Sequence, residues 1–295
     1  MASFAMRAAI ALIRFGGKPM RDPQKYLAVR QNRTRSEPPP MPKKLAARCT
    51  VDERKVEGQR VLTLTPHEGR SRWTLIYLHG GAYTNEMRPA HWTWIAALME
   101  ATGARIILPL YARAPEHDHR PAHAMMAALY DQLLQNIDPA TIVIGGDSSG
   151  AGLALGAMMT ARDAGRPMPA QMLLFAPWLD ITCANPLGAA IEARDPMLGL
   201  EAARTCGQWW AGDADPTLPH LSPAFGTALG LPPIHIYQGS LDMVAPDAVA
   251  FAETGRAAGA NVTLHLYEGA PHVFVAAVFT REAKEVLAHI KGLLA

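Results

Sequence analysis

A five-residue motif between an apolar strand and a helix constrains this chain most. Residues 146–150 read Gly-Asp-Ser-Ser-Gly, after a β-branched run at 141–144 and before a small-residue segment at 149–163 that predicts a helix. A serine at the tip of so sharp a turn has a strained backbone, and only glycine-sized neighbours leave room for the two elements. In this context the motif is typical of a nucleophile elbow, with Ser148 at a helix N-terminus. The alternative is a glycine-rich turn in a nucleotide-binding sheet.

Strand and helix patterns alternate through most of the chain. This alternation predicts an α/β fold, with a mostly parallel central sheet flanked by helices on both faces. An earlier strand is expected at 56–65, where apolar and polar residues alternate. The other strands are expected at 73–78, 105–110, 141–144, 171–175, 234–237 and 261–267, and the helices at 89–102, 121–136, 149–163, 246–258 and 278–294.

Two segments outside this alternation are expected to form a helical cap. Residues 1–20 have apolar residues at helical spacing, and the helix should end at Gly16, Gly17 and Pro19. It either packs over the body of the protein or attaches to a membrane surface. A proline-rich connector follows at 36–42, and a break of some fifty residues at 181–231 is too long for a plain loop. The expected division is a cap part at 1–45, core at 46–180, a cap insertion at 181–231 and core again at 232–295.

Charge and cysteine content argue against several classes of partner. The formal net charge of the 295 residues is +2, without a long lysine or arginine block, so nucleic acid is not an expected partner. No segment is long and apolar enough for stable membrane insertion. The three cysteines have no metal-site spacing, so we expect no metal site and reduced, buried thiols in a cytoplasmic protein.

A serine nucleophile requires a base and a carboxylate that orients the base. His272 directly follows the last strand, and Asp242 directly follows the strand at 234–237. The order Ser148, Asp242, His272 is that of α/β-hydrolases. Asp180 is the rival acid, while Asp247 is better explained as a charge in the first turn of a helix.

Other histidines have simpler explanations than catalysis. His79 follows a strand but precedes the serine, and His265 lies within a strand. A further group lacks carboxylate or cysteine partners at ligand spacing and predicts a surface or capping cluster: His117, His119 and His123.

Backbone donors for an oxyanion are expected from two places. One is the N–H of Ser149, directly after the nucleophile. The other is the loop after the strand at 73–78, where Gly80 shapes the turn and Gly81 and Ala82 present bare amides. Tyr83, Trp209 and Trp210 are the predicted substrate-binding residues by position, and Met87 is a further candidate. The alternative is that these aromatic and methionine side chains belong to the core.

Together these motifs resemble the hormone-sensitive-lipase-like (bacterial family IV) carboxylesterases of the α/β-hydrolase fold. The resemblance extends from about residue 73 to the end. It departs at Ala82, where the family usually has a third glycine, and at 242–244, where it usually has Asp-Pro-Leu. The motifs are His-Gly-Gly-Ala at 79–82, Tyr-Ala-Arg-Ala-Pro-Glu-His at 111–117, Gly-Asp-Ser-Ser-Gly at 146–150, Gly-Ser-Leu-Asp at 239–242 and Gly-Ala-Pro-His-Val-Phe at 269–274.

The resemblance implies hydrolysis of small-molecule carboxylic esters with short to medium acyl chains, without a cofactor. Family members are often dimers, so a homodimer is one expected assembly. A lactone or another acyl substrate on the same triad is the alternative. A non-catalytic ligand-binding receptor on this fold is disfavoured because His272 is present.

Overall fold

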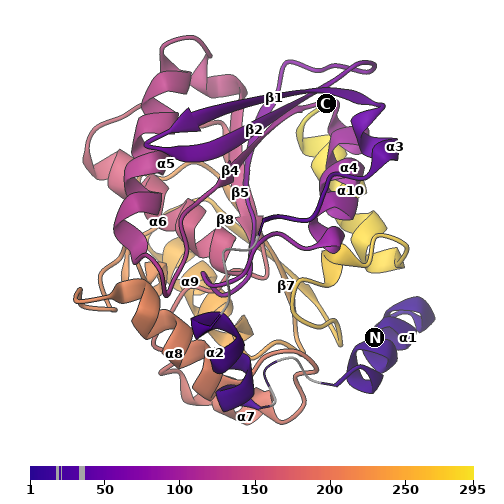
Figure 1. The fold of residues 1–295 in the computed structure, drawn as a ribbon, viewed down its shortest axis with the longest axis vertical. Coiled ribbons are helices and arrows are strands. Elements are labelled where there is room, and N and C mark those ends of the chain that lie inside the picture. The colour runs from indigo at the N-terminus through magenta and orange to yellow at the C-terminus, as the bar shows by residue number, and fades with distance from the viewer. Residues whose placement is uncertain (18–19, 21, 33–36) are drawn as a thin grey trace.

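An eight-stranded sheet forms the centre of the molecule in the computed structural model, which describes residues 1–17, 20, 22–32 and 37–295 (Figure 1). The strand order is β1-β2-β4-β3-β5-β6-β7-β8. Strand β2 is antiparallel to both neighbours and the other pairs are parallel. The strands are β1 (Cys49–Val56), β2 (Gln59–Pro66), β3 (Thr74–Leu78), β4 (Arg105–Leu110), β5 (Ile142–Asp147), β6 (Gln171–Phe175), β7 (Ile234–Gly239) and β8 (Val262–Tyr267).

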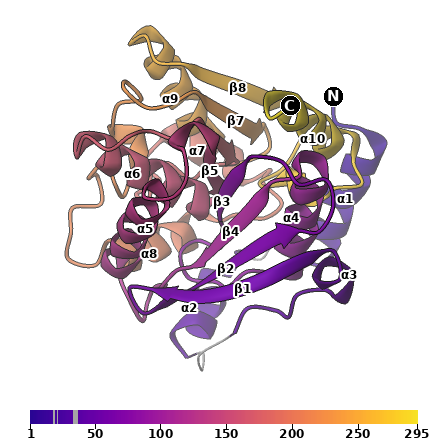
Figure 2. The same ribbon diagram turned by 90° about the horizontal axis from the view of Figure 1, so that it is seen from above.

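Helices cover both faces of this sheet (Figures 1 and 2). Helices α5, α6 and α9 lie on one side, and α4 and α10 lie on the other. The α-helices are α1 (Phe4–Phe15), α2 (Pro23–Gln31), α3 (Lys43–Ala46), α4 (Pro89–Thr102), α5 (His119–Leu134), α6 (Ser149–Asp163), α7 (Pro186–Glu192), α8 (Leu200–Ala211), α9 (Ala245–Ala257) and α10 (Arg281–Leu293).

Alternate side chains of the central strands fill two separate cores. In β3, Ile76 and Leu78 join the apolar cluster under α5 and α6, while Leu75 and Tyr77 join the cluster under α4 and α10. A strand buried on both faces therefore has no solvent-facing position, which explains the mostly apolar run in its sequence. The predicted α/β class is confirmed.

The first hairpin differs from the sequence prediction. The strand expected at 56–65 contains a turn, since Glu57 and Gly58 both have positive φ, and the strand proper is β2. The edge strand β1 was not predicted, because its central side chains are exposed and mostly charged and therefore show no apolar alternation.

The break at 181–231 contains the α-helices α7 and α8 and a short 3-10 helix at Pro223–Phe225. Helix α8 lies beside α2, so an N-terminal segment and the insertion meet in space (Figure 1). Helix α2 was not predicted. Ser36, the first residue of the predicted connector, lies outside the described residues.

Helix α1 is amphipathic, as expected, and packs on the body of the protein. Met6 and Ile10 are buried beside α10, and the Ser3 hydroxyl donates to Glu282 (Oγ to Oε2, 2.7 Å). Its outer side leaves Phe4 and Phe15 exposed. The helix ends at Phe15, directly before Gly16 and Gly17, as expected; Pro19 lies outside the described residues. None of the helices in the described part of the chain is long and apolar enough to cross a membrane.

Candidate active site

The turn between β5 and α6 presents Ser148 in a strained conformation. Its φ is +53° and its ψ is −123°, a region that residues with a side chain seldom occupy. A Cβ at Gly146 or at Gly150 would collide with the carbonyl oxygen of Leu78. Strand β3 therefore approaches the turn so closely that both flanking positions require glycine, as the sequence predicted.

Ser148, His272 and Asp242 form one hydrogen-bonded chain. The distance from Ser148 Oγ to His272 Nε2 is 2.8 Å, and from His272 Nδ1 to Asp242 Oδ2 it is 2.7 Å. Each residue follows a strand, and parallel strands end at the same sheet edge. The carboxylate of Asp242 also accepts from Gln238 Nε2 (2.7 Å) and the Val244 N–H (3.1 Å), which hold it in place.

The net effect of its surroundings raises the pKa of His272. Burial opposes this, but the charge and hydrogen bond of Asp242 outweigh burial, and Asp195 and Asp147 add to the effect. A carboxylate on the far ring nitrogen both orients the imidazole and stabilises its protonated form. The ring is thus arranged to take a proton from Ser148.

We expect kcat/KM to fall as the pH is lowered through this raised pKa, because the protonated ring no longer accepts the serine proton. The midpoint should lie above the ordinary histidine value of 6.5. Hydrolysis of p-nitrophenyl acetate, followed by initial rates across the neutral range, measures it. A midpoint at or below 6.5 would contradict the expected arrangement.

The loop after β3 lies against Ser148. A Cβ at Gly80 would come within 2.8 Å of the Ser148 Cβ, so the loop fits there only with glycine. Gly81 and Ala82 line the cavity beside Ser148. Within the described residues, no acceptor takes the N–H groups of Gly81, Ala82 or Ser149, which are therefore available to an anion.

Asp147 is a structural residue of this site that the sequence analysis did not identify. Tyr77 donates its hydroxyl to Asp147 Oδ1 (2.6 Å), and His91 Nε2 lies 3.3 Å from Oδ2. Burial opposes ionisation, but His91, Tyr77 and the Gly80 N–H together lower the pKa of Asp147. The carboxylate thereby ties the loop after β3 to the elbow. A charged residue at the end of an otherwise apolar strand was the available signal.

Asp195 is a second residue that was not identified. It lies in the insertion, is buried, and accepts the N–H of Met243 with Oδ2 (2.9 Å). Its other oxygen accepts from Met197 (2.7 Å) and Leu198 (2.9 Å). Asp195 therefore joins the insertion to the segment that carries Asp242. A single aspartate in an irregular segment has no sequence signature.

The rival residues lie in other environments. Asp180 accepts hydrogen bonds from its own loop, at Thr182 and Ala184. Asp247 bonds to Asn185 (2.8 Å). Burial lowers the pKa of His79 to about 3, and its ring stacks on Tyr111. The ring is therefore neutral and packed in the interior.

The predicted surface cluster of histidines is only partly at the surface. His117 is exposed, but His119 is buried, and His123 is partly buried. Burial lowers the pKa of His123 to about 3, and both rings lie near Trp210. His119 and His123 are one helical turn apart, so both side chains point inward against α8.

A largely apolar cavity of about 260 Å³ opens at Ser148 and His272. Three residues of α1 on one helical face line it, at positions 6, 9 and 13. The loop before α8 contributes two more side chains. These five residues are Met6, Ala9, Ile13, Met197 and Leu198.

The predicted substrate-binding residues do not line this cavity. Tyr83 is buried and stacks on Trp210, with ring centroids 4.1 Å apart. Trp209 and the further candidate Met87 also lie away from the cavity. Helix α8 turns Trp210 toward the body of the protein, so the segment before α8 faces Ser148 instead.

Comparisons with known proteins agree with this geometry. A family model described as the alpha/beta hydrolase fold matches residues 75–276. An acetyl-hydrolase from Streptomyces hygroscopicus is 36% identical over 202 residues, which cover 68% of each chain. An esterase from Acinetobacter venetianus is 31% identical over 219 residues, covering 73% of this chain and 72% of that protein. The crystal structure of an esterase from the bacterial hormone-sensitive lipase family has a TM-score of 0.83 and 25% identity, covering 100% of this chain and 98% of that one.

A mostly parallel sheet with a strained serine between a strand and a helix defines an α/β-hydrolase. The chain belongs, within that fold, to the hormone-sensitive-lipase-like (bacterial family IV) carboxylesterases. It is a carboxylic ester hydrolase, and the resemblance based on its five motifs is confirmed.

Proposed function

We propose that the chain hydrolyses short- to medium-chain carboxylic esters through a Ser148–His272–Asp242 triad and an acyl-enzyme. The observation that carries the proposal is the pair of hydrogen bonds, 2.8 and 2.7 Å long, from the serine to the histidine and on to the carboxylate. They open onto an apolar cavity, which suits an acyl chain.

In the proposed mechanism His272 removes the proton of Ser148 as the serine oxygen attacks the ester carbonyl. The backbone N–H groups of Gly81, Ala82 and Ser149 stabilise the oxyanion, and Gly80 shapes the loop. His272 then protonates the leaving alcohol, which gives the acyl-enzyme. Water attacks the acyl group by the same route, with His272 again as base, and Ser148 is released.

Helices α1 and α2 and the insertion at 181–231 form the proposed cap over this site. Support comes from α1 and from the segment before α8, which both line the cavity, and from the contact between α2 and α8. Residues 46–180 and 232–295 form the proposed hydrolase core, which contributes all three triad residues.

The small cavity favours a short acyl chain. Its volume of about 260 Å³ is below the range of roughly 300–1,000 Å³ for pockets that enclose drug-sized ligands. We expect p-nitrophenyl acetate and butyrate to have the highest kcat/KM, and laurate and palmitate far lower values. A series of purified esters of increasing acyl length measures this profile. A steady rise toward long chains would contradict the proposed specificity.

Ala9→Phe tests the contribution of α1 to acyl selection. The added ring should fill part of the cavity, so kcat/KM for p-nitrophenyl hexanoate should fall at least tenfold more than for the acetate, equivalent to about 1.4 kcal/mol. Ala8→Phe is the matched control, because Ala8 is exposed on the same helix. Equal effects of the two variants on both esters would show that α1 does not set acyl length.

A further inference from the structure

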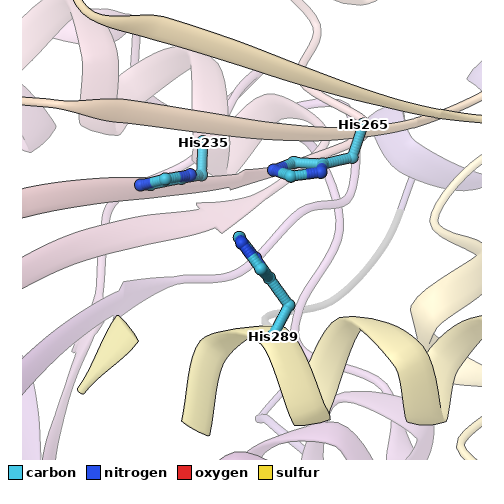
Figure 3. Close-up of side chains that lie close together, drawn as sticks. All are labelled: His235, His265 and His289. Atoms are coloured by element: carbon cyan, nitrogen blue, oxygen red, sulfur yellow. The ribbon is translucent and has the colours of Figure 1, made fainter. Parts of the chain in front are cut away.

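Three histidines outside the candidate active site converge between the last two strands and the last helix (Figure 3). His235 is in β7, His265 is in β8, and His289 is in α10. In the parallel pairing of these strands, His235 is opposite Thr263 and Tyr237 is opposite His265. The two strand histidines therefore project from the same face of the sheet, which α10 covers.

The nitrogen atoms of these rings are gathered closely. One ring nitrogen of each histidine lies within 4.8 Å of the other two. Figure 3 shows His289 extending from its helix toward the two strand side chains. All three are partly buried, so the group lies near the surface, at the edge strand, where an ion can reach it.

Two of these rings have a buried nitrogen without a hydrogen-bond partner. Within the described residues, neither His235 Nδ1 nor His265 Nε2 has one. Buried polar atoms are rarely left unpaired in folded proteins, and a bound water or ion commonly supplies the partner.

The third histidine has an outer hydrogen-bond partner that can fix the orientation of its ring. His289 Nδ1 lies 2.8 Å from Tyr237 Oη. With the Nδ1 proton donated to that oxygen, the lone pair of Nε2 faces the other two rings. Tyr237 also stacks on His265, with ring centroids 4.8 Å apart, and so positions two of the three rings.

We propose that His235, His265 and His289 bind one divalent transition-metal ion, with zinc as the best match. Three imidazole nitrogens suit zinc, copper, nickel and cobalt, and water completes a tetrahedron. Zinc–nitrogen bonds of 2.0–2.1 Å place the nitrogens about 3.3 Å apart, so the rings need shifts of only about 1 Å each. The bound ion would link β8 and α10 to β7.

The sequence analysis expected no metal site because no ligand spacing was evident. These histidines are far apart in the chain and come together only through β pairing and helix docking. A second group, formed by His119, His123 and His220, has rings as close as 5.2 Å, but its ligand atoms are not gathered in the same way. That group therefore provides an internal control.

The test uses the full chain without an affinity tag, stripped with a chelator and titrated with cobalt(II) chloride and zinc chloride. One cobalt ion per chain should give the visible absorption of a tetrahedral site, and zinc should displace it. Zinc should also raise Tm, because it binds the folded state. His289→Gln and His265→Gln should each weaken binding more than 100-fold, since loss of an outer partner alone weakens it about 10–100-fold. His220→Ala should bind like the unchanged protein.

Far-UV circular dichroism checks that each variant folds, and two independent ligand variants guard against a folding defect in one. Absence of a tetrahedral cobalt spectrum at micromolar ion overturns the proposal. Unchanged affinity in both ligand variants, or loss of binding in His220→Ala instead, also overturns it. Binding should persist in Ser148→Ala, so this result is independent of the proposed ester hydrolysis.

Discussion

Ser148→Ala is expected to lower kcat for p-nitrophenyl acetate by about 10⁶-fold, the loss found when a serine hydrolase loses its nucleophile. The substitution removes the oxygen that lies 2.8 Å from His272 Nε2, so no acyl-enzyme forms. The fold should persist, because the hydroxyl makes its one described contact with His272, while the backbone of residue 148 retains its bond to Phe175. Initial rates and Tm measure the two effects.

Ser149→Ala is the matched control, one residue along the same turn. Ser149 is proposed to act through its backbone N–H, which alanine retains. Its hydroxyl accepts the N–H of Tyr83 at 3.2 Å, so the variant should lose stability but retain most of its turnover. A fluorophosphonate probe should label the Ser149→Ala protein at Ser148 and leave Ser148→Ala unlabelled. Labelling of Ser149 in the Ser148→Ala protein, with retained turnover, would reverse the assignment.

Asp242→Asn is expected to lower kcat by about 10⁴-fold, because an amide permits the wrong tautomer of the histidine. In the unchanged protein the carboxylate accepts from His272 Nδ1 at 2.7 Å and so leaves the lone pair of Nε2 facing Ser148. An asparagine NH₂ donates to Nδ1 and moves the ring proton to Nε2. Loss of the negative charge should also lower the pKa of His272, so the residual activity should show an acid limb shifted to lower pH.

Asp180→Asn is the control for this second prediction, because Asp180 was the rival acid. Its carboxylate accepts from Thr182 and Ala184 within its own loop, and no described bond joins it to His272. It should reduce stability and leave the pH profile of kcat/KM unchanged. A collapse of turnover in Asp180→Asn, with activity retained in Asp242→Asn, would show that the acid is misassigned.

Much of the fold could be predicted because buried parallel strands leave a strong signal. Strand β4, helix α4 and strand β6 have the expected bounds, since continuous apolar runs occur where a strand is covered on both faces. The signal failed at β1, an edge strand with exposed charged residues, and at α2, a short helix with one buried residue. Neither segment buries enough apolar surface to show a periodic pattern.

The proximity of Ser148, Asp242 and His272 could likewise be anticipated, because each directly follows a parallel strand and such strands end at one edge. The residues that line the cavity could not be anticipated from the sequence. Position along the chain suggested Tyr83 and Trp210, yet these rings stack in the core. Asp195 joins the insertion to the acid segment only because the insertion folds back over the sheet.

The sequence by itself determined the class of fold, the serine turn and the family, because these depend on local steric rules and on alternation along the chain. The tertiary structure decided which residues surround the cavity at Ser148 and which histidines meet at the last two strands. The reason is physical: a side chain on a helix or an irregular segment gains its neighbours through docking, and docking depends on the whole packed surface. His235 and His289 are neighbours only because α10 lies across β7 and β8.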